Sequence, residues 1–286
     1  MGSFMNHAIQ GSDPRTRDQR PDRMLGRRRP TPLSLVLGVT VSVLLAACGG
    51  GGGGESSDGT FRTPLPTLST DIPPSGPRLD LQGRDYFPAT VGDRWDYGVG
   101  LAAQTATDGT LSRTVTAVHA DGSVAIKETY LGSSDTAIRY RRTAEGITVS
   151  PLTGAAPLAV QNLVGPLLQY PEPFYAVGRE RVAVRQGSWG EDLDGDGRAE
   201  SFRFEFRQTL TSLGTLTVAS RPLADVAHFR NVSTLMVQPS DLRETSYTVT
   251  TVENAWWAPG IGLVRYDFRA DGSDGEVVVS PYTLLL

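Results

Sequence analysis

The sequence predicts a mainly β domain of antiparallel strands. Between residues 202 and 207, three phenylalanines alternate with charged residues, which places aromatic rings on one face of a strand and charges on the other. Shorter alternating runs follow along most of the chain, and the pairs Asp121-Gly122 and Asp271-Gly272 have the composition of hairpin turns. Because the connections are short, neighbouring strands are expected to pair antiparallel.

The first 47 residues have the order of charge and hydrophobicity of an export signal. Three arginines at 27–29 precede an uncharged, mostly apolar run at 33–47. A helix over this run would be about 22 Å long, against about 30 Å for the hydrocarbon core of a bilayer, so we expect its removal after export. Residues 1–23 are polar with charges of both signs, and we expect Met24 to be the true start.

The tetrapeptide Leu45-Ala46-Ala47-Cys48 resembles the lipobox of bacterial lipoproteins. The resemblance implies that the Cys48 thiol is acylated, that the chain is cut before it, and that a membrane holds the mature protein. Stable anchoring takes two or more acyl chains. Gly49, in place of an aspartate that retains such proteins at the inner membrane, implies the outer membrane. The alternative is a free cysteine buried in a helix, which the six following glycines disfavour.

Residues 48–82 have the composition of a tether. Six glycines come first, followed by a Ser/Asp/Gly stretch and then by five prolines between 64 and 77. A glycine-rich chain is flexible and a proline-rich chain is extended, so we expect a spacer between membrane and domain. A segment that binds a partner is the alternative. The β domain is then expected to cover residues 83–286.

Alternation and turn residues place the elements of this domain in order. One helix is expected at 157–168, although Gly165 and Pro166 interrupt it late, and it would pack on the sheet or close one end. Strands are expected at 95–101, 114–120, 123–130, 137–141, 147–150, 181–185, 202–207, 215–219, 232–237, 247–252, 263–268 and 276–279.

Charge and cysteine content argue against nucleic-acid binding and against a disulfide-stabilised fold. The leader holds seven of the 27 basic and three of the 31 acidic residues, which leaves 20 and 28 after the signal and a net charge of −8. An acidic surface argues against nucleic acid as a partner. A lone cysteine allows no intramolecular disulfide, so stability has to come from a core, which about 200 residues can form.

Two motifs rich in aromatic residues bracket the predicted domain. The first is YFPATVGDRWDY at 86–97, and the second is WWAPGIGLVRY at 256–266. Together they resemble a group of bacterial lipoproteins without a characterised activity, which share "FP…G…W.Y" and "W.APG.G.V". That group is similar to the lipoprotein-carrier (LolA/LolB-like) type, a curved antiparallel sheet or half-barrel with a helical lid. The resemblance covers both ends of the domain, while the middle is matched only by strand pattern, and it implies a fold but no activity.

Four aromatic residues of these motifs are candidates to line an apolar groove inside the curved sheet: Trp95, Tyr97, Trp256 and Trp257. Such a groove would take a hydrophobic ligand. Packing in the core or at its rim is the favoured interpretation, because large aromatic side chains dominate core burial.

The segment 192–200 predicts a calcium loop. Its sequence, Asp-Leu-Asp-Gly-Asp-Gly-Arg-Ala-Glu, places three carboxylates at alternate positions beside glycines that permit a sharp bend. Ca²⁺ takes about six to eight oxygen ligands, and clustered carboxylates repel one another without a cation. The expected ligands are the side chains of Asp192, Asp194 and Asp196, the carbonyl of Arg198 and the side chain of Glu200.

An EF-hand is excluded because its twelfth position, which needs a glutamate, is Arg203 here. The loop resembles those of integrin-type and VCBS repeats, with Glu200 in place of the final aspartate. That resemblance implies a structural Ca²⁺ ion. An acidic surface turn without an ion is the alternative.

Catalytic motifs are sparse. The Gly-Ser pairs lack the context of a nucleophile elbow, and His119 and His228 lie in alternating runs typical of strands. The sequence therefore predicts a lipid-anchored envelope protein of the outer membrane that is not an enzyme. It would bind a hydrophobic ligand or another envelope protein, or act as a scaffold. A hydrolytic enzyme and a purely structural surface lipoprotein are the alternatives.

Overall fold

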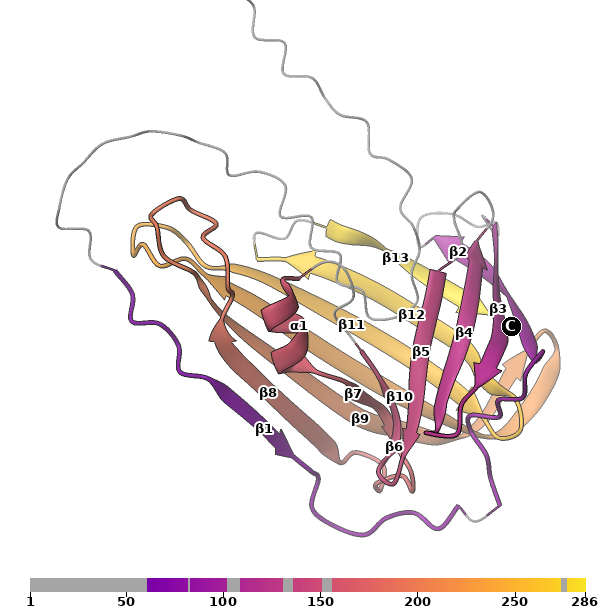
Figure 1. The fold of residues 1–286 in the computed structure, drawn as a ribbon. Helices are drawn as coiled ribbons and strands as arrows, with labels where there is room; N and C mark the ends of the chain where they lie inside the picture. Colours follow the sequence, from indigo (N-terminus) through magenta and orange to yellow (C-terminus); the bar gives the residue numbers. More distant parts are fainter. Residues whose placement is uncertain (1–60, 82, 102–108, 131–135, 151–155, 274–276) are drawn as a thin grey trace, which may run out of the picture. The chain divides into compact units, whose positions relative to one another are not determined.

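The computed structural model describes residues 61–81, 83–101, 109–130, 136–150, 156–273 and 277–286. Over these residues the prediction of a mainly β fold with a single antiparallel sheet is confirmed. Within them, thirteen strands form one open sheet in the order β1-β8-β9-β10-β11-β12-β13-β2-β3-β4-β5-β6-β7, and one short helix packs against β8 (Figure 1).

Every neighbouring pair of strands is antiparallel. In chain order the elements are β1 (Leu68–Ile72), β2 (Arg94–Leu101), β3 (Gly109–Val118), β4 (Ser123–Tyr130), β5 (Thr136–Thr143), β6 (Gly146–Val149), α1 (Leu158–Val164), β7 (Leu167–Pro171), β8 (Glu180–Ser188), β9 (Ser201–Val218), β10 (Arg221–Gln238), β11 (Tyr247–Ala258), β12 (Gly262–Gly272) and β13 (Val277–Leu285).

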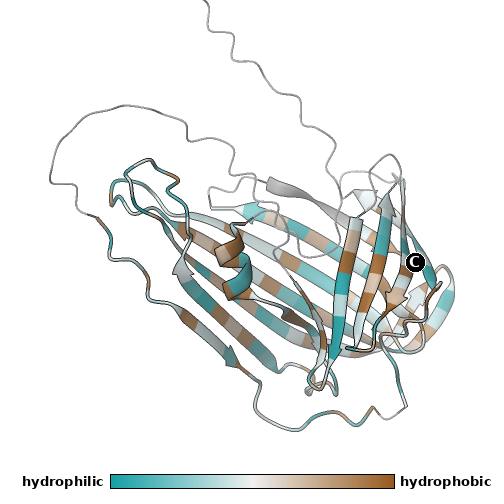
Figure 2. Cartoon of the chain, viewed as in Figure 1, coloured by the Kyte–Doolittle hydropathy of each residue, from teal (hydrophilic) through white to brown (hydrophobic). Residues whose placement is uncertain are grey.

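The sheet buries one face, as the alternation in the sequence predicts. Phe202, Phe204 and Phe206 of β9 are each at most 3% exposed, whereas the charged residues between them reach the other face. Figure 2 shows the same alternation of apolar and polar residues along the long strands β9 to β12. The inward rings join one continuous core with residues from both ends of the sheet.

The sheet curls so far that β7, the edge strand at the end of the sheet order, packs on the inner face of β10 and β11. The Tyr170 ring of β7 lies 5.1 Å from that of Trp257 in β11 and 5.9 Å from that of Phe229 in β10. Phe174, just after β7, meets Phe229 edge-on at 5.1 Å. Aromatic pairs at these distances add to the free energy gained by burying the rings.

A polar row inside the core also connects β7 to β9. Gln208, Asn231 and Glu253 are register neighbours on β9, β10 and β11, and all three point inward. The side-chain amide of Gln208 donates to the carbonyls of Leu168 and Gln169 on β7, and at 3.2 Å to Asn231. Asn231 donates in turn to Glu253 at 3.4 Å. Buried polar groups need such partners, so this row favours one position of β7 over others.

The close passage of β6 beside β7 requires glycine at position 146. Its φ is 135°, and a Cβ there would lie 2.3 Å from the carbonyl oxygen of Tyr170 and 2.7 Å from the amide nitrogen of Glu172. No side chain fits at such distances, and only glycine adopts this backbone conformation readily.

The range predicted as a tether, 48–82, includes part of the folded structure. Here β1 pairs with β8, and Phe61 forms a backbone bridge with Asp241. Four of the five residues of β1 are exposed, so this edge strand carries no apolar alternation, and the prolines and glycines on either side of it dominate the composition of the range. The tether prediction is therefore too long, because residues 61–81 contact the sheet or lead along it.

Most other predicted elements differ in their bounds, and the larger differences have identifiable causes. The helix at 157–168 ends at Val164, since Gly165 takes a φ of 63° and the apolar residues after Pro166 form β7 instead. The runs at 202–207 and 215–219 belong to the single strand β9. Asp121-Gly122 is confirmed as a turn, with Gly122 donating to the His119 carbonyl, whereas Asp271 and Gly272 are the last residues of β12.

Glu253 gives the fold a pH dependence that can be measured. Burial raises the pKa of its carboxyl from 4.5 to about 7, so the fold favours the protonated form. This stabilisation is fully present below pH 4.5 and is lost as the pH rises through 7. We expect the free energy of unfolding in urea to fall by on the order of 3 kcal/mol from this group between pH 5 and pH 8, and Glu253→Gln to remove that fall.

The matched control is Glu244→Gln, because Glu244 is exposed in the β10–β11 connection. It should leave the pH dependence of unfolding unchanged. Equal slopes in the wild type and Glu253→Gln would contradict the assignment.

Candidate functional site

The acidic segment forms the connection between β8 and β9. The Trp189 amide donates to the Glu200 carbonyl at 2.7 Å, and the Glu200 amide donates to the Glu191 carbonyl at 3.1 Å. These bonds extend the hairpin and close the chain between them into a compact loop. Gly195 and Gly197 bend the loop with φ values of 82° and 85°, in the left-handed region that glycine accepts at little cost.

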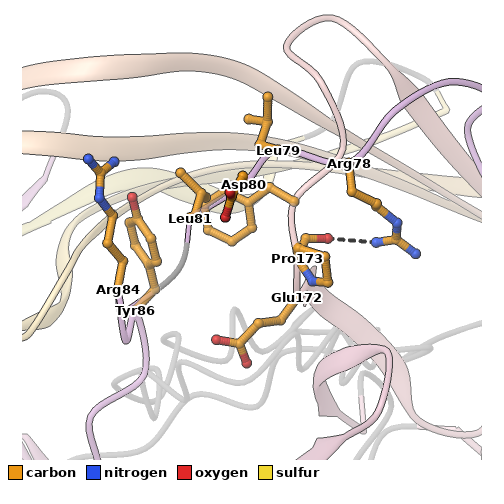
Figure 3. A pocket seen from close by; sticks show the side chains of 9 residues that line it. Arg78, Leu79, Asp80, Leu81, Arg84, Tyr86, Glu172 and Pro173 are labelled. Atoms are coloured by element: carbon orange, nitrogen blue, oxygen red, sulfur yellow. Dashed lines mark hydrogen bonds between the residues drawn. The ribbon is translucent and has the colours of Figure 1, made fainter.

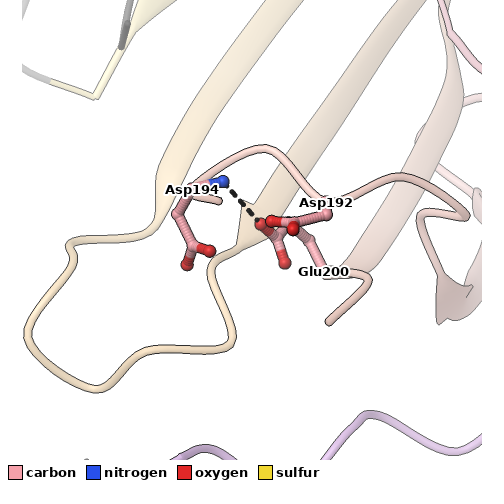
Figure 4. Close-up of side chains that lie close together, drawn as sticks. All are labelled: Asp192, Asp194 and Glu200. Atoms are coloured by element: carbon pink, nitrogen blue, oxygen red, sulfur yellow. Dashed lines mark hydrogen bonds between the residues drawn. The ribbon is translucent and has the colours of Figure 1, made fainter. Parts of the chain in front are cut away.

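Carboxylates fold this loop onto itself. Asp192 accepts hydrogen bonds from the amides of Gly195 at 2.7 Å and Gly197 at 2.8 Å. One oxygen of Glu200, Oε1, accepts from the Leu193 amide at 2.9 Å. The same oxygen accepts from the Asp194 amide at 3.1 Å (Figure 4). A carboxylate oxygen from each of Asp192, Asp194 and Glu200 lies within 4.8 Å of the other two. Three of the predicted calcium ligands are thus brought together.

The side chains of Asp196 and Arg198 contact neighbouring segments. One carboxylate oxygen of Asp196 accepts from the Arg198 amide at 2.8 Å, and the other accepts from the hydroxyl of Ser240 in the β10–β11 connection. The guanidinium of Arg198 lies 3.8 Å above the ring of Phe61. The sequence did not indicate Ser240, which is 44 residues away from its partner.

The acidic loop contains buried negative charge that its hydrogen bonds neutralise only in part. Glu200 is 1% exposed, and its second oxygen, Oε2, has no hydrogen-bond partner among the described residues. Burial raises the pKa of the Glu200 carboxyl, and the charges of Asp194 and Asp196 raise it further. Burial also raises the pKa of Asp194, whereas hydrogen bonds from backbone amides, first that of Gly197, lower the pKa of Asp192. A buried carboxylate oxygen beside two more carboxylates is a donor set that suits a hard divalent cation.

The two aromatic motifs, far apart in the sequence, contact each other in the fold. The indole of Trp95 donates to the Ile261 carbonyl at 2.7 Å, and the hydroxyl of Tyr97 donates to the Leu263 carbonyl at 2.9 Å. The Gly260 amide donates to the Asp85 carbonyl at 2.7 Å. The side chains of Trp95 and Tyr97, in the first motif, therefore bind backbone carbonyls of the second motif.

The four aromatic residues predicted to line a groove do not surround one. Trp95, Tyr97 and Trp257 border a space of about 10 Å³, which is the size needed for a single water molecule. Trp256 is half-buried on the other face of β11, where it stacks on His228 at 4.1 Å between ring centroids. The predicted groove is therefore absent at these described positions. A packed core lies there instead, because inward aromatic rings from both ends of the sheet fill the space.

A larger cavity of about 470 Å³ lies where the segment before β2 meets the chain after β7 (Figure 3). The rings of Tyr86 and Phe174 stand 4.7 Å apart at its apolar wall. Its charges contact protein groups: Arg84 pairs with Asp225 at 3.1 Å, and Arg78 donates to the Pro173 carbonyl at 2.6 Å. The lining residues are Arg78, Leu79, Asp80, Leu81, Arg84, Tyr86, Glu172, Pro173 and Phe174. Sequence analysis missed this cavity because Leu79 and Leu81 lie in the range predicted as a tether.

The two histidines after the signal lie apart from the acidic loop, and the cysteine is outside the described residues. His119 is exposed at the β3–β4 turn. The Nε2 atom of His228 lies 3.2 Å from the amide oxygen of Asn254, and burial lowers the pKa of the imidazole. Cys48 lies outside the described residues, and within them no helix is long and apolar enough to span a bilayer.

Comparison with known proteins gives two structural matches. No family model matches the chain, and no curated protein matches it. A candidate lipoprotein from Parabacteroides distasonis is similar over 70% of this chain and 97% of its own, with 15% identity and a TM-score of 0.40. A candidate exported protein with a YmcC-like fold from Bacteroides fragilis covers 71% of this chain and 97% of its own, with 14% identity and a TM-score of 0.39.

Proposed function

We propose that the chain is a lipoprotein of the cell envelope, held at the outer membrane through Cys48, whose β domain is a non-catalytic binding module with a structural Ca²⁺ loop. The observation that carries the proposal is the buried Glu200 carboxylate, which clusters with those of Asp192 and Asp194 and has one oxygen without a hydrogen-bond partner. Leaving a buried carboxylate unpaired is costly, and a divalent cation would neutralise all three groups at once.

The order of features in the sequence supports the location. The apolar run at 33–47, the small residues before Cys48 and the glycines after it are those of an exported and lipidated chain. Millimolar Ca²⁺ outside the cytoplasm suits a structural loop of this kind, because calcium sites of extracellular modules bind with a Kd of about 10⁻⁴ to 10⁻³ M.

The binding role is supported by the cavity next to β7, whose volume of about 470 Å³ is that of a small-molecule site. Its wall of Tyr86, Phe174 and two leucines suits an apolar ligand. Glu172 at its edge is the group that favours a hydrolytic enzyme instead, since burial raises the pKa of its carboxyl. Its ion pair with Arg142 at 3.1 Å supports a structural role, and so does the Asn254 partner of His228.

Calorimetric titration of the detergent-purified protein with Ca²⁺ tests the loop. We expect a single site with a Kd of about 10⁻⁴ to 10⁻³ M. Asp194→Asn should weaken binding by about tenfold or more, because it removes one charged oxygen ligand while keeping the side-chain shape. No binding heat at millimolar Ca²⁺ would refute the calcium loop.

Glu191→Gln is the matched control, since Glu191 is exposed in the same loop and stands outside the carboxylate cluster. It should bind Ca²⁺ as the wild type does. Equal weakening by both substitutions would mean that general surface charge, rather than a built site, attracts the cation.

Cys48→Ser tests the anchor. The wild-type protein should fractionate with membranes and have an intact mass equal to residues 48–286 plus acyl chains. The variant should lose the acyl mass and leave the membrane after salt washing. Gly51→Ala, which changes the glycine run but keeps the cysteine, should behave as the wild type. A Cys48→Ser protein that keeps the wild-type mass and fractionation would rule out lipid attachment there.

A further inference from the structure

We propose that cation binding in the acidic loop holds the N-terminal arm on the sheet, where the arm is residues 61–72, including β1. The inference rests on the proposed Ca²⁺ site. Under this proposal, cation binding also affects residues that do not touch the ion. The acidic loop contacts both the arm and the segment 239–244, which the arm binds through Arg62.

The first connection is direct. Arg198, inside the acidic loop, stacks its guanidinium 3.8 Å above the Phe61 ring. Ser201, the residue after Glu200, accepts a hydrogen bond from the Leu65 amide at 2.9 Å. The beginning of the arm therefore rests on the loop and on the residue that follows it.

The second connection runs through the β10–β11 segment at 239–244. The Ser240 hydroxyl donates to Asp196, and the Asp241 amide lies 3.5 Å from a carboxylate oxygen of Asp194. Arg62 clamps the other side of this segment, because its guanidinium donates to the carbonyls of Pro239 at 2.8 Å, Asp241 at 2.6 Å, Leu242 at 3.5 Å and Glu244 at 2.8 Å. The Arg62 amide adds a bond to the Ser240 carbonyl at 2.7 Å. The carboxylates and the arm thus grip the same short segment from two sides.

Few apolar contacts hold the arm otherwise. Phe61, Leu68 and Ile72 are 39%, 38% and 53% exposed. Further along, Asp71 pairs with Arg185 at 2.9 Å and with Arg181 at 3.1 Å. Arg185 also donates to the Thr70 carbonyl at 2.9 Å and Gln186 to the Pro66 carbonyl at 3.1 Å, beside the β1–β8 ladder. An edge strand with so little buried apolar surface opens locally at a small cost in free energy, so added contacts at 61–65 lower how often it opens.

The cation would act by removing repulsion. Carboxylate oxygens of Asp192, Asp194 and Glu200 lie within 4.8 Å of one another, and one oxygen of Glu200 is buried without a hydrogen-bond partner. Without a cation, these groups favour a looser loop, which would weaken the Asp196–Ser240 bond and move Arg198 away from Phe61. Bound Ca²⁺ closes the loop and so favours the docked arm. Because the arm lies between Cys48 and the sheet in the sequence, its release would lengthen the segment that joins domain and membrane.

Hydrogen exchange read by mass spectrometry tests this coupling on the full protein in detergent. Amides of β1 should exchange about tenfold more slowly in millimolar Ca²⁺ than in chelator, while β4 should show no change. Asp194→Asn should abolish the calcium effect on β1. Arg62→Ala, which removes the clamp but none of the carboxylates, should bind Ca²⁺ like the wild type and yet leave β1 exchanging rapidly in its presence.

The outcomes separate this inference from the proposed calcium site. Normal binding heat together with identical β1 exchange in Ca²⁺ and chelator would overturn the coupling and leave the site standing. Normal calcium protection of β1 in Arg62→Ala would overturn the proposed route through the 239–244 segment. The absence of binding heat would overturn both the site and the coupling.

Discussion

The contact between the last strand, β7, and the inner face of β9, β10 and β11 is the constraint on which the rest of the fold depends. An open sheet of this length has one apolar face to bury, and no second layer among the described residues is large enough to cover it. The sheet therefore covers itself by curling. Tyr170 against Trp257 and Phe229 supplies the apolar contact, and the bonds from Gln208 to the β7 backbone fix where the strand lies.

This closure explains why the aromatic motifs are packed rather than open to a ligand. Once the two ends of the sheet share a core, the inward rings of Trp95, Tyr97 and Trp257 have to fill it, and their polar atoms turn to backbone carbonyls where these are in reach. A cavity of about 470 Å³ is left where β7 gives way to the following chain, beside Phe174. The acidic loop lies at the end of the β8–β9 hairpin and contacts the arm, so the proposed cation acts on the edge of the sheet rather than on its core.

Sequence patterns predicted those features whose causes are local. The alternation of Phe202, Phe204 and Phe206 determines a strand by itself, and the spacing of Asp192, Asp194 and Glu200 lies within one loop. Features that depend on distant partners were not predicted. Exposed β1 has no apolar pattern of its own, Gln208 finds its carbonyl partners only on the distant strand β7, and Ser240 meets Asp196 only after two hairpins lie side by side.

Terbium luminescence tests the central claim, a cation held by the acidic loop, most directly. Trp189 is buried, and its backbone amide donates to the Glu200 carbonyl at 2.7 Å, so this tryptophan directly adjoins the acidic loop. Excitation of the indole should produce Tb³⁺ emission that saturates with a single ion, is displaced by Ca²⁺, and is lost in Trp189→Phe but kept in Trp256→Phe. Emission no stronger than that of free Tb³⁺, or emission that persists in Glu200→Gln, would contradict the account.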